Sequence, residues 1–247
     1  MDTFIFVHDY DIIAEYERTG KFAKIFGRDY RYVFLGYKEV IPSEKIIVAR
    51  SLPENIEDLP RLVTYTGWYA LVKNNLITNK YNLLLEYDVV LNPKFEKVVT
   101  QFIRQTKAKE VFSFISTEKD FMFYEYLSEF LGEEGIKAFK ARREEFIAAH
   151  HQEKWMGSSN SLWKRETLIA FVNWFAAFLD SDFRNYADIG HTVERALTVF
   201  CVTRDIKYNF IRGVLKHFYL DSHRTQAVYN GGIQKDYRQY VQALAEQ

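Results

Sequence analysis

The sequence predicts an α/β protein with a doubly wound, mostly parallel β-sheet, helices on both faces of the sheet and a helical C-terminal half. Short apolar runs alternate with helical segments in the first half, a pattern typical of parallel sheets. Long helical stretches follow one another in the second half. No low-complexity linker separates the halves, and the last proline is Pro93. We therefore expect a single domain over residues 1–247, with an alternating half at about 1–118 and a helical half at about 119–247.

The first half is expected to begin with a strand at residues 3–7. A short helix or loop at 11–26 should follow, punctuated by Gly20 and Gly27. The remaining expected elements are strands at 30–35, 45–49, 83–91 and 110–115, an aromatic-rich helix at 61–74, and a helix that begins after Asn92 with Pro93 in its first position.

Helical periodicity dominates the second half. It predicts helices at residues 121–131, 133–150, 164–179, 192–204 and, at the C-terminus, 236–247. A weaker β signal lies among them around residues 156–162. We interpret these helices as a continuous layer on the same sheet.

Composition narrows the class of protein. The chain is 48% hydrophobic, and its 33 Lys and Arg balance its 33 Asp and Glu, so charge gives no reason to expect a nucleic-acid partner. Cys201 is the single cysteine, which excludes a disulfide framework and favours a reducing, cytoplasmic location. The longest apolar segment, 167–179, is short of the ~20 residues that span a bilayer. We expect no transmembrane segment, and peripheral membrane contact stays open.

Two carboxylates interrupt the apolar run at residues 83–91. Desolvating Glu86 and Asp88 without compensation is costly, so something must balance their charge. Residues two apart in a strand point the same way, and the predicted strand therefore places both on one face, with Tyr87 on the other. Such a pair suits a hard divalent cation that keeps some waters and is completed by a phosphate. Salt bridges to nearby Lys or Arg are the alternative.

Further polar residues should gather at the same edge of the sheet. His8, Asp9 and Asp11 follow the first strand, and open α/β sheets bind ligands beyond the carboxyl ends of their strands. In the second half, residues 157–163 include Asn160 and offer donors and acceptors for substrate hydroxyls. A loop with an N-cap is the alternative, and it suits Ser161 better.

Two more clusters carry candidate chemistry. Residues 188–195 place His191 and Arg195 on one helical face, with Glu194 beside them. A solvated helix start is the alternative. Residues 217–224 hold two His and one Asp with alternating spacing, which would offer ligands to a metal or donors to a phosphate from one side of an extended segment. Ordinary surface histidines are the alternative there.

An α/β first half that ends in a Glu-x-Asp carboxylate pair, then a helical half and a C-terminal histidine, resembles the GT-A class of nucleotide-sugar-dependent glycosyltransferases. The likeness is closest to small single-domain enzymes of bacteria and large DNA viruses that build surface glycans. The commoner motif is Asp-x-Asp, so Glu86 departs from it by one methylene. Under this resemblance Glu86 ligates the metal directly, ligates it through water, or holds the donor sugar.

The resemblance implies hexosyl or pentosyl transfer from a UDP- or GDP-linked donor to a glycan or polysaccharide acceptor. Mn²⁺ or Mg²⁺ would neutralise the diphosphate leaving group. The first half, about 1–118, would bind the nucleotide, and the second, about 119–247, the acceptor. The implied metal set is Asp88, Glu86, His223 and His217, and the implied donor set is Val7, His8, Asp9, Tyr87, Glu86 and Arg224.

For the transfer step we expect Glu194 or Asp188 as the base that takes the acceptor proton, with His191 beside them, if the reaction inverts the anomeric carbon. A retaining reaction needs neither. The expected acceptor residues are Trp68, Asn160 and Trp163, with core packing as the alternative for Trp68. Two other functions remain open: a glycan- or nucleotide-binding module without turnover, and a sugar-nucleotide nucleotidyltransferase, although the glycine-rich loop of the latter is missing after the first strand.

Overall fold

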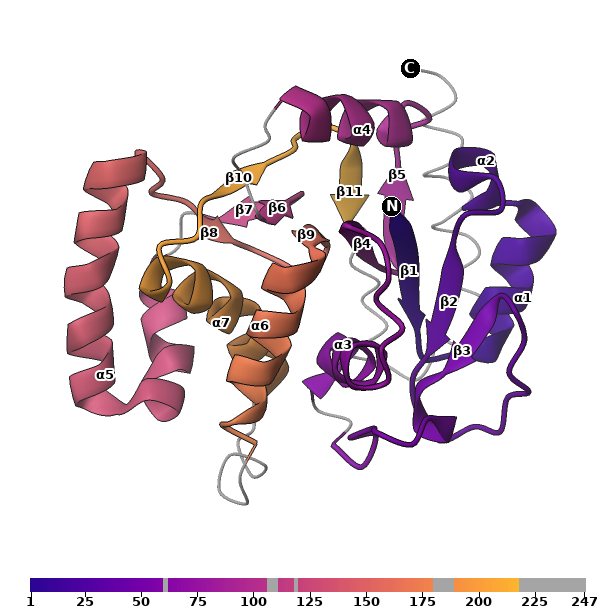
Figure 1. The fold of residues 1–247 in the computed structure, drawn as a ribbon, viewed down its shortest axis with the longest axis horizontal. Helices are drawn as coiled ribbons and strands as arrows, with labels where there is room; N and C mark the ends of the chain where they lie inside the picture. Colours follow the sequence, from indigo (N-terminus) through magenta and orange to yellow (C-terminus); the bar gives the residue numbers. More distant parts are fainter. Residues whose placement is uncertain (60–61, 106–110, 118–119, 180–188, 218–247) are drawn as a thin grey trace.

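The structure, a computed structural model, describes residues 1–59, 62–105, 111–117, 120–179 and 189–217 (Figure 1). A seven-stranded sheet with the order β10-β6-β9-β4-β1-β2-β3 forms the centre of this described part. All neighbouring pairs are parallel except those of β9, which runs antiparallel to β4 and β6. The strands are β1 (Asp2–Val7), β2 (Arg31–Phe34), β3 (Ile46–Val48), β4 (Tyr81–Glu86), β6 (Val111–Ser113), β9 (Ser161–Lys164) and β10 (Tyr208–Phe210).

Two small antiparallel sheets accompany the large one. Strand β5 (Val89–Leu91) pairs with β11 (Leu215–His217), and β7 (Ser116–Thr117) pairs with β8 (Trp155–Met156). The first of these matters for the candidate site, because β5 follows β4 after a two-residue turn. The C-terminal end of the described chain is thereby brought to the end of β4.

Helices cover both faces of the sheet, which confirms the predicted fold class. Along β1, Phe4 and Phe6 enter one hydrophobic core while Ile5 and Val7 enter the other. The first core includes side chains of α3 (Thr64–Lys73), α5 (Asp120–His150), α6 (Arg165–Ala176) and α7 (Ile189–Thr203), as well as the short helix η1 (Ala49–Ser51). The second includes side chains of α1 (Tyr10–Thr19), α2 (Ala23–Phe26) and α4 (Phe95–Gln105). In Figure 1, α5, α6 and α7 stand at the left, and α1 and α2 at the right.

Local signals in the sequence account for several element ends. The carboxylate of Asp9 caps α1 by accepting from the backbone N–H of Asp11 at 3.1 Å. Gly20 ends α1 in the left-handed conformation, with φ 66°. Gly132, with φ 67°, interrupts α5 where the sequence predicts a gap between two helices. No helix in the described ranges is long and apolar enough to cross a membrane.

The structure corrects two predictions of local structure. The strand expected at 83–91 is broken, because β4 ends at Glu86 and residues 87–88 form a turn before β5. Glu86 and Asp88 therefore do not share one strand face. The second half also contributes β9, β10 and β11, whereas only a weak signal around 156–162 was predicted. Strands of three residues are too short to show a period-two pattern. The terminal helix expected at 236–247 lies outside the described residues.

Gly67 of α3 lies where the helix meets the sheet most closely. A Cβ atom at this position would be 2.7 Å from the ring of Phe6 and 2.9 Å from Leu35. A residue without a Cβ atom therefore lets α3 pack directly on these core side chains.

We expect Gly67→Ala to destabilise the protein by about 1–3 kcal/mol, because overpacking outweighs the gain of about 1 kcal/mol in helix propensity. The free energy of unfolding, measured in denaturant, tests this. Phe6→Leu provides the control, since the smaller side chain should make the loss in the double variant smaller than the sum of the two single losses. A Gly67→Ala variant as stable as the parent would contradict the close approach.

Candidate active site

The candidate site lies where β1 and β4 end side by side. The backbone N–H of Tyr87 donates to the carbonyl of Phe6 at 3.1 Å, so the turn after β4 is tied to the end of β1. The ring of His8 meets the ring of Tyr87 edge-on, with centroids 4.9 Å apart. Asp9 is buried, and its carboxylate forms an ion pair with the ammonium of Lys38, with Oδ1 3.3 Å from Nζ. The expected donor residues Val7, His8, Asp9, Glu86 and Tyr87 thus occupy one edge of the sheet.

Helix α1 and the residues that follow it form hydrogen bonds with the turn at residues 87–88. The carbonyl oxygen of Tyr87 accepts hydrogen bonds from the hydroxyl of Tyr16 at 3.1 Å and from the ammonium of Lys21 at 2.7 Å. That ammonium also lies 3.9 Å from the centroid of the Tyr16 ring. Burial lowers the pKa of Lys21 well below its usual value, and the negative charge of Asp88 opposes this shift.

Asp88 and Glu86 differ in their surroundings. Asp88 is buried, and Lys21 is a cation in its electrostatic environment. This arrangement supports the alternative interpretation of Asp88, in which a nearby lysine compensates its charge. Glu86 is half-buried at the end of β4 and faces a side-chain amide.

This amide belongs to Asn160, which forms two hydrogen bonds with Glu86 across 74 positions of the sequence. Its side-chain oxygen accepts from the backbone N–H of Glu86 at 2.8 Å, and its side-chain nitrogen donates to the Glu86 carboxylate at 3.1 Å. Ser158 supports it, since the serine hydroxyl accepts from the backbone and the side-chain nitrogen of Asn160. Asn160 is fully buried, so its side chain does not contact solvent. Its role is to orient the side chain of Glu86 through these hydrogen bonds.

The two expected acceptor tryptophans lie in the core. Trp68 and Trp163 are 1% and 0% exposed, and their ring centroids are 6.2 Å apart. Trp163 also donates its indole N–H to the hydroxyl of Ser161 at 2.8 Å. A ring buried on both faces has no surface for an acceptor, so we do not assign these two residues to acceptor binding. Core packing, the alternative for Trp68, describes its position.

Strand β11 brings His217 to the same turn. In its pairing with β5, His217 stands opposite Val89, the residue after Asp88. This register concerns the backbone, and the side chain of His217 is outside the described part. His223 and Arg224, the other expected residues of this segment, lie outside the described residues.

The residues present fit a hard divalent cation in kind. Glu86 and Asp88 supply carboxylate oxygens, the preferred ligands of Mg²⁺ and Mn²⁺. Within the described ranges no three His, Cys, Asp or Glu residues form a group that could hold a metal. A protein-held metal would therefore take further ligands from water, from the donor's phosphates or from residues beyond the described set.

The expected base lies on α7. Glu194 accepts a hydrogen bond from Arg195 at 2.6 Å, and Arg195 is buried. The side chain of His191 on the same helix is not among those described, and Asp188 lies outside the described residues.

Sequence reasoning missed Tyr16 and Lys21. Their contacts with Tyr87 span 71 and 66 positions, and neither residue belongs to a motif. Lys21 follows the helix-ending Gly20 and would ordinarily be taken for a solvated cation. No short-range signal distinguishes it from the other lysines.

Comparison with solved structures finds a chain of similar fold. The apo structure of WbbM, a bifunctional glycosyltransferase, matches with a TM-score of 0.53 and 12% identity, over 87% of this chain and 45% of that chain. The apo form of mouse xyloside xylosyltransferase 1 matches with a TM-score of 0.41 and 8% identity, over 85% and 84%. This chain thus spans less than half of the WbbM chain. No protein-family model and no curated protein matches the sequence. The fold is α/β and GT-A-like.

We expect Asn160→Asp to lower the free energy of unfolding by about 1–2 kcal/mol more than Asn160→Ala at neutral pH, because it sets a second carboxylate against Glu86. The two charges repel only while both groups are ionised. The extra loss should therefore be largest at pH 7 and shrink as acid protonates the introduced carboxylate. Denaturant unfolding of both variants at pH 7 and at lower pH tests this. Equal losses at every pH would remove the contact between residues 160 and 86.

Proposed function

We propose that this chain is a metal-dependent glycosyltransferase that moves a hexosyl or pentosyl unit from a UDP- or GDP-linked donor to a glycan or polysaccharide acceptor in the cytoplasm. The single observation that supports this most is the meeting of the ends of β1 and β4, Asn160 and β11 at one edge of a GT-A-like sheet. Carboxylates at that edge suit a donor diphosphate only through a bridging cation.

In this proposal Asp88 is the principal protein ligand of Mn²⁺ or Mg²⁺. The cation would supply Lewis-acid neutralisation of the diphosphate as the glycosidic bond breaks. Glu86, whose carboxylate is oriented by Asn160, would contact the cation or the donor sugar. His217, whose backbone pairs with Val89, is a further candidate, and His223 and Arg224 are candidates from the following segment.

The nucleoside would lie over the end of β1. Val7, His8 and Asp9 form this edge. The T-shaped contact between His8 and Tyr87 connects it to the turn at residues 87–88. Glu194 or Asp188 would take the acceptor proton in an inverting reaction. The catalytic base must lie within hydrogen-bond distance of the hydroxyl group of the sugar acceptor.

A screen of donor hydrolysis tests the proposed function. UDP- and GDP-sugars are incubated with the protein and Mn²⁺, and the released nucleotide diphosphate is measured by chromatography. We expect slow release from one donor class and its loss when a chelator removes the cation. Release that is equally fast in the presence of the chelator would argue against metal dependence.

Asp88→Asn should abolish the Mn²⁺-dependent thermal stabilisation by nucleotide diphosphate. The apoprotein should lose about 1–3 kcal/mol of stability, because the charge of Lys21 loses its compensating carboxylate. The double variant Lys21→Met with Asp88→Asn is the matched control. It should recover stability without recovering Mn²⁺-dependent binding. Wild-type nucleotide affinity of Asp88→Asn in Mn²⁺ would make Asp88 a structural partner of Lys21 alone.

Glu194→Gln should reduce sugar transfer by about 10²–10⁴-fold if Glu194 is the base. Donor binding should stay unchanged, because the amide oxygen still accepts from Arg195. Transfer is measured with radiolabelled donor and acceptor, and donor binding by calorimetry. Near-normal transfer would leave Asp188 or a retaining mechanism.

A further inference from the structure

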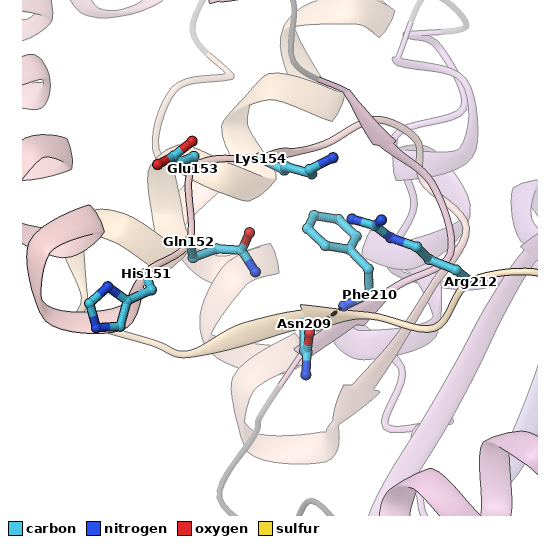
Figure 2. Close-up of a pocket in the computed structure, with 7 residues that line it drawn as sticks. All are labelled: His151, Gln152, Glu153, Lys154, Asn209, Phe210 and Arg212. Carbon is cyan, nitrogen blue, oxygen red and sulfur yellow. Dashed lines mark hydrogen bonds between the residues drawn. The ribbon is translucent and has the colours of Figure 1, made fainter.

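A cavity lies between the chain that follows α5 and strand β10 (Figure 2). Its volume is about 310 Å³, within the range of sites that hold one small ligand. The walls come from residues 151–154 and from residues 209–212. None of these residues takes part in the proposed donor site.

Four side chains of different chemistry point into the same space. Figure 2 shows the amide of Gln152, the ammonium of Lys154, the ring of Phe210 and the guanidinium of Arg212 turned toward one another. The carboxylate of Glu153 points away from them. Arg212 lies with its guanidinium carbon 6.0 Å from the Phe210 centroid and forms no ion pair with any residue in the described ranges.

Hydrogen bonds from neighbouring side chains hold the backbone of residues 153–154 in one wall of the cavity. The hydroxyl of Tyr208 donates to the carbonyl of Lys154 at 2.8 Å, and the side chain of Arg143 donates to the carbonyl of Glu153 at 2.7 Å. Tyr208 itself is buried against Phe146, with parallel rings 5.6 Å apart. The two walls are therefore joined, and the side chains project from a supported frame.

We propose that this cavity binds an anionic saccharide unit. The guanidinium of Arg212 on one wall and the ammonium of Lys154 on the other suit a carboxylate or phosphate group. The side-chain nitrogen of Gln152 donates to the carbonyl of Tyr208 at 3.4 Å, and its side-chain oxygen suits a sugar hydroxyl. The half-buried ring of Phe210 offers an apolar face to the carbon side of a sugar ring. Neutral sugars would satisfy the amide and the ring but leave the guanidinium of Arg212 without an anionic partner.

The chain connects this cavity with the candidate active site. Arg212 precedes His217 by five positions, a stretch that reaches at most about 17 Å. His217 stands opposite Val89, beside Asp88. The cavity therefore suits a distal subsite for an acidic sugar of the acceptor. That assignment as acceptor subsite rests on the proposed function, whereas the binding chemistry itself does not.

Ligand-observed NMR titration tests the cavity directly. Glucuronate and glucose 6-phosphate are compared with glucose and with inorganic phosphate, using the full chain without Mn²⁺. We expect at least one anionic sugar to bind and Arg212→Ala to weaken it about five- to tenfold. The preferred anionic sugar identifies carboxylate or phosphate as the recognised group. Lys137→Ala, which removes an exposed cation on α5, should have no effect.

Two results would overturn the proposal, and a third would contradict recognition of the sugar. One is binding of glucose as strong as that of both anionic sugars, and the other is anionic-sugar binding that Arg212→Ala leaves unchanged. Inorganic phosphate that binds as well as glucose 6-phosphate would also contradict recognition of the sugar. Asp88→Asn separates this site from the proposed function, since it should leave glucuronate binding unaltered while it abolishes Mn²⁺-dependent nucleotide binding. Each site can therefore fail without the other.

Discussion

The carbonyl oxygen of Tyr87 is the point on which the candidate site depends. Two donors, Tyr16 and Lys21, fix it from the α1 side, while the N–H of the same residue is tied to β1. Residues 87 and 88 form the turn that follows β4. The turn leaves Glu86 as the last residue of β4 and places Asp88 directly before β5. Strand β11 pairs with β5 beyond this turn.

The fold itself was predictable because its signals are local. Buried residues alternate between two cores along β1, and Asp9, Gly20 and Gly132 mark element ends in ways that the sequence shows directly. The break in β4 was not predictable. Apolar residues continue on both sides of it, and neither glycine nor proline marks the turn. The three-residue strands β10 and β11 are defined by their partners, since three residues cannot establish a period.

The candidate site divides along the same line. Glu86 and Asp88 could be identified because carboxylates inside an apolar run require compensation. Their neighbours Asn160 and Lys21 become meaningful only through contacts across 74 and 66 positions. Aromatic residues misled the acceptor prediction for the opposite reason. In a chain with 17% aromatic residues, a tryptophan is more often part of a core such as that around Trp68 than part of a sugar platform.

Lys21 also constrains how the proposed site would work. Burial lowers the pKa of Lys21 and the charge of Asp88 opposes that shift, so in the proposed function the lysine would offset part of the carboxylate's charge before a ligand binds. The same charge would repel an incoming divalent ion and weaken the binding of a metal to the protein alone. A nucleotide diphosphate brings the negative charge that offsets this repulsion. In the proposed function, therefore, cation and donor bind more tightly together than either does separately, a coupling that follows from Lys21 and its contact with the Tyr87 carbonyl.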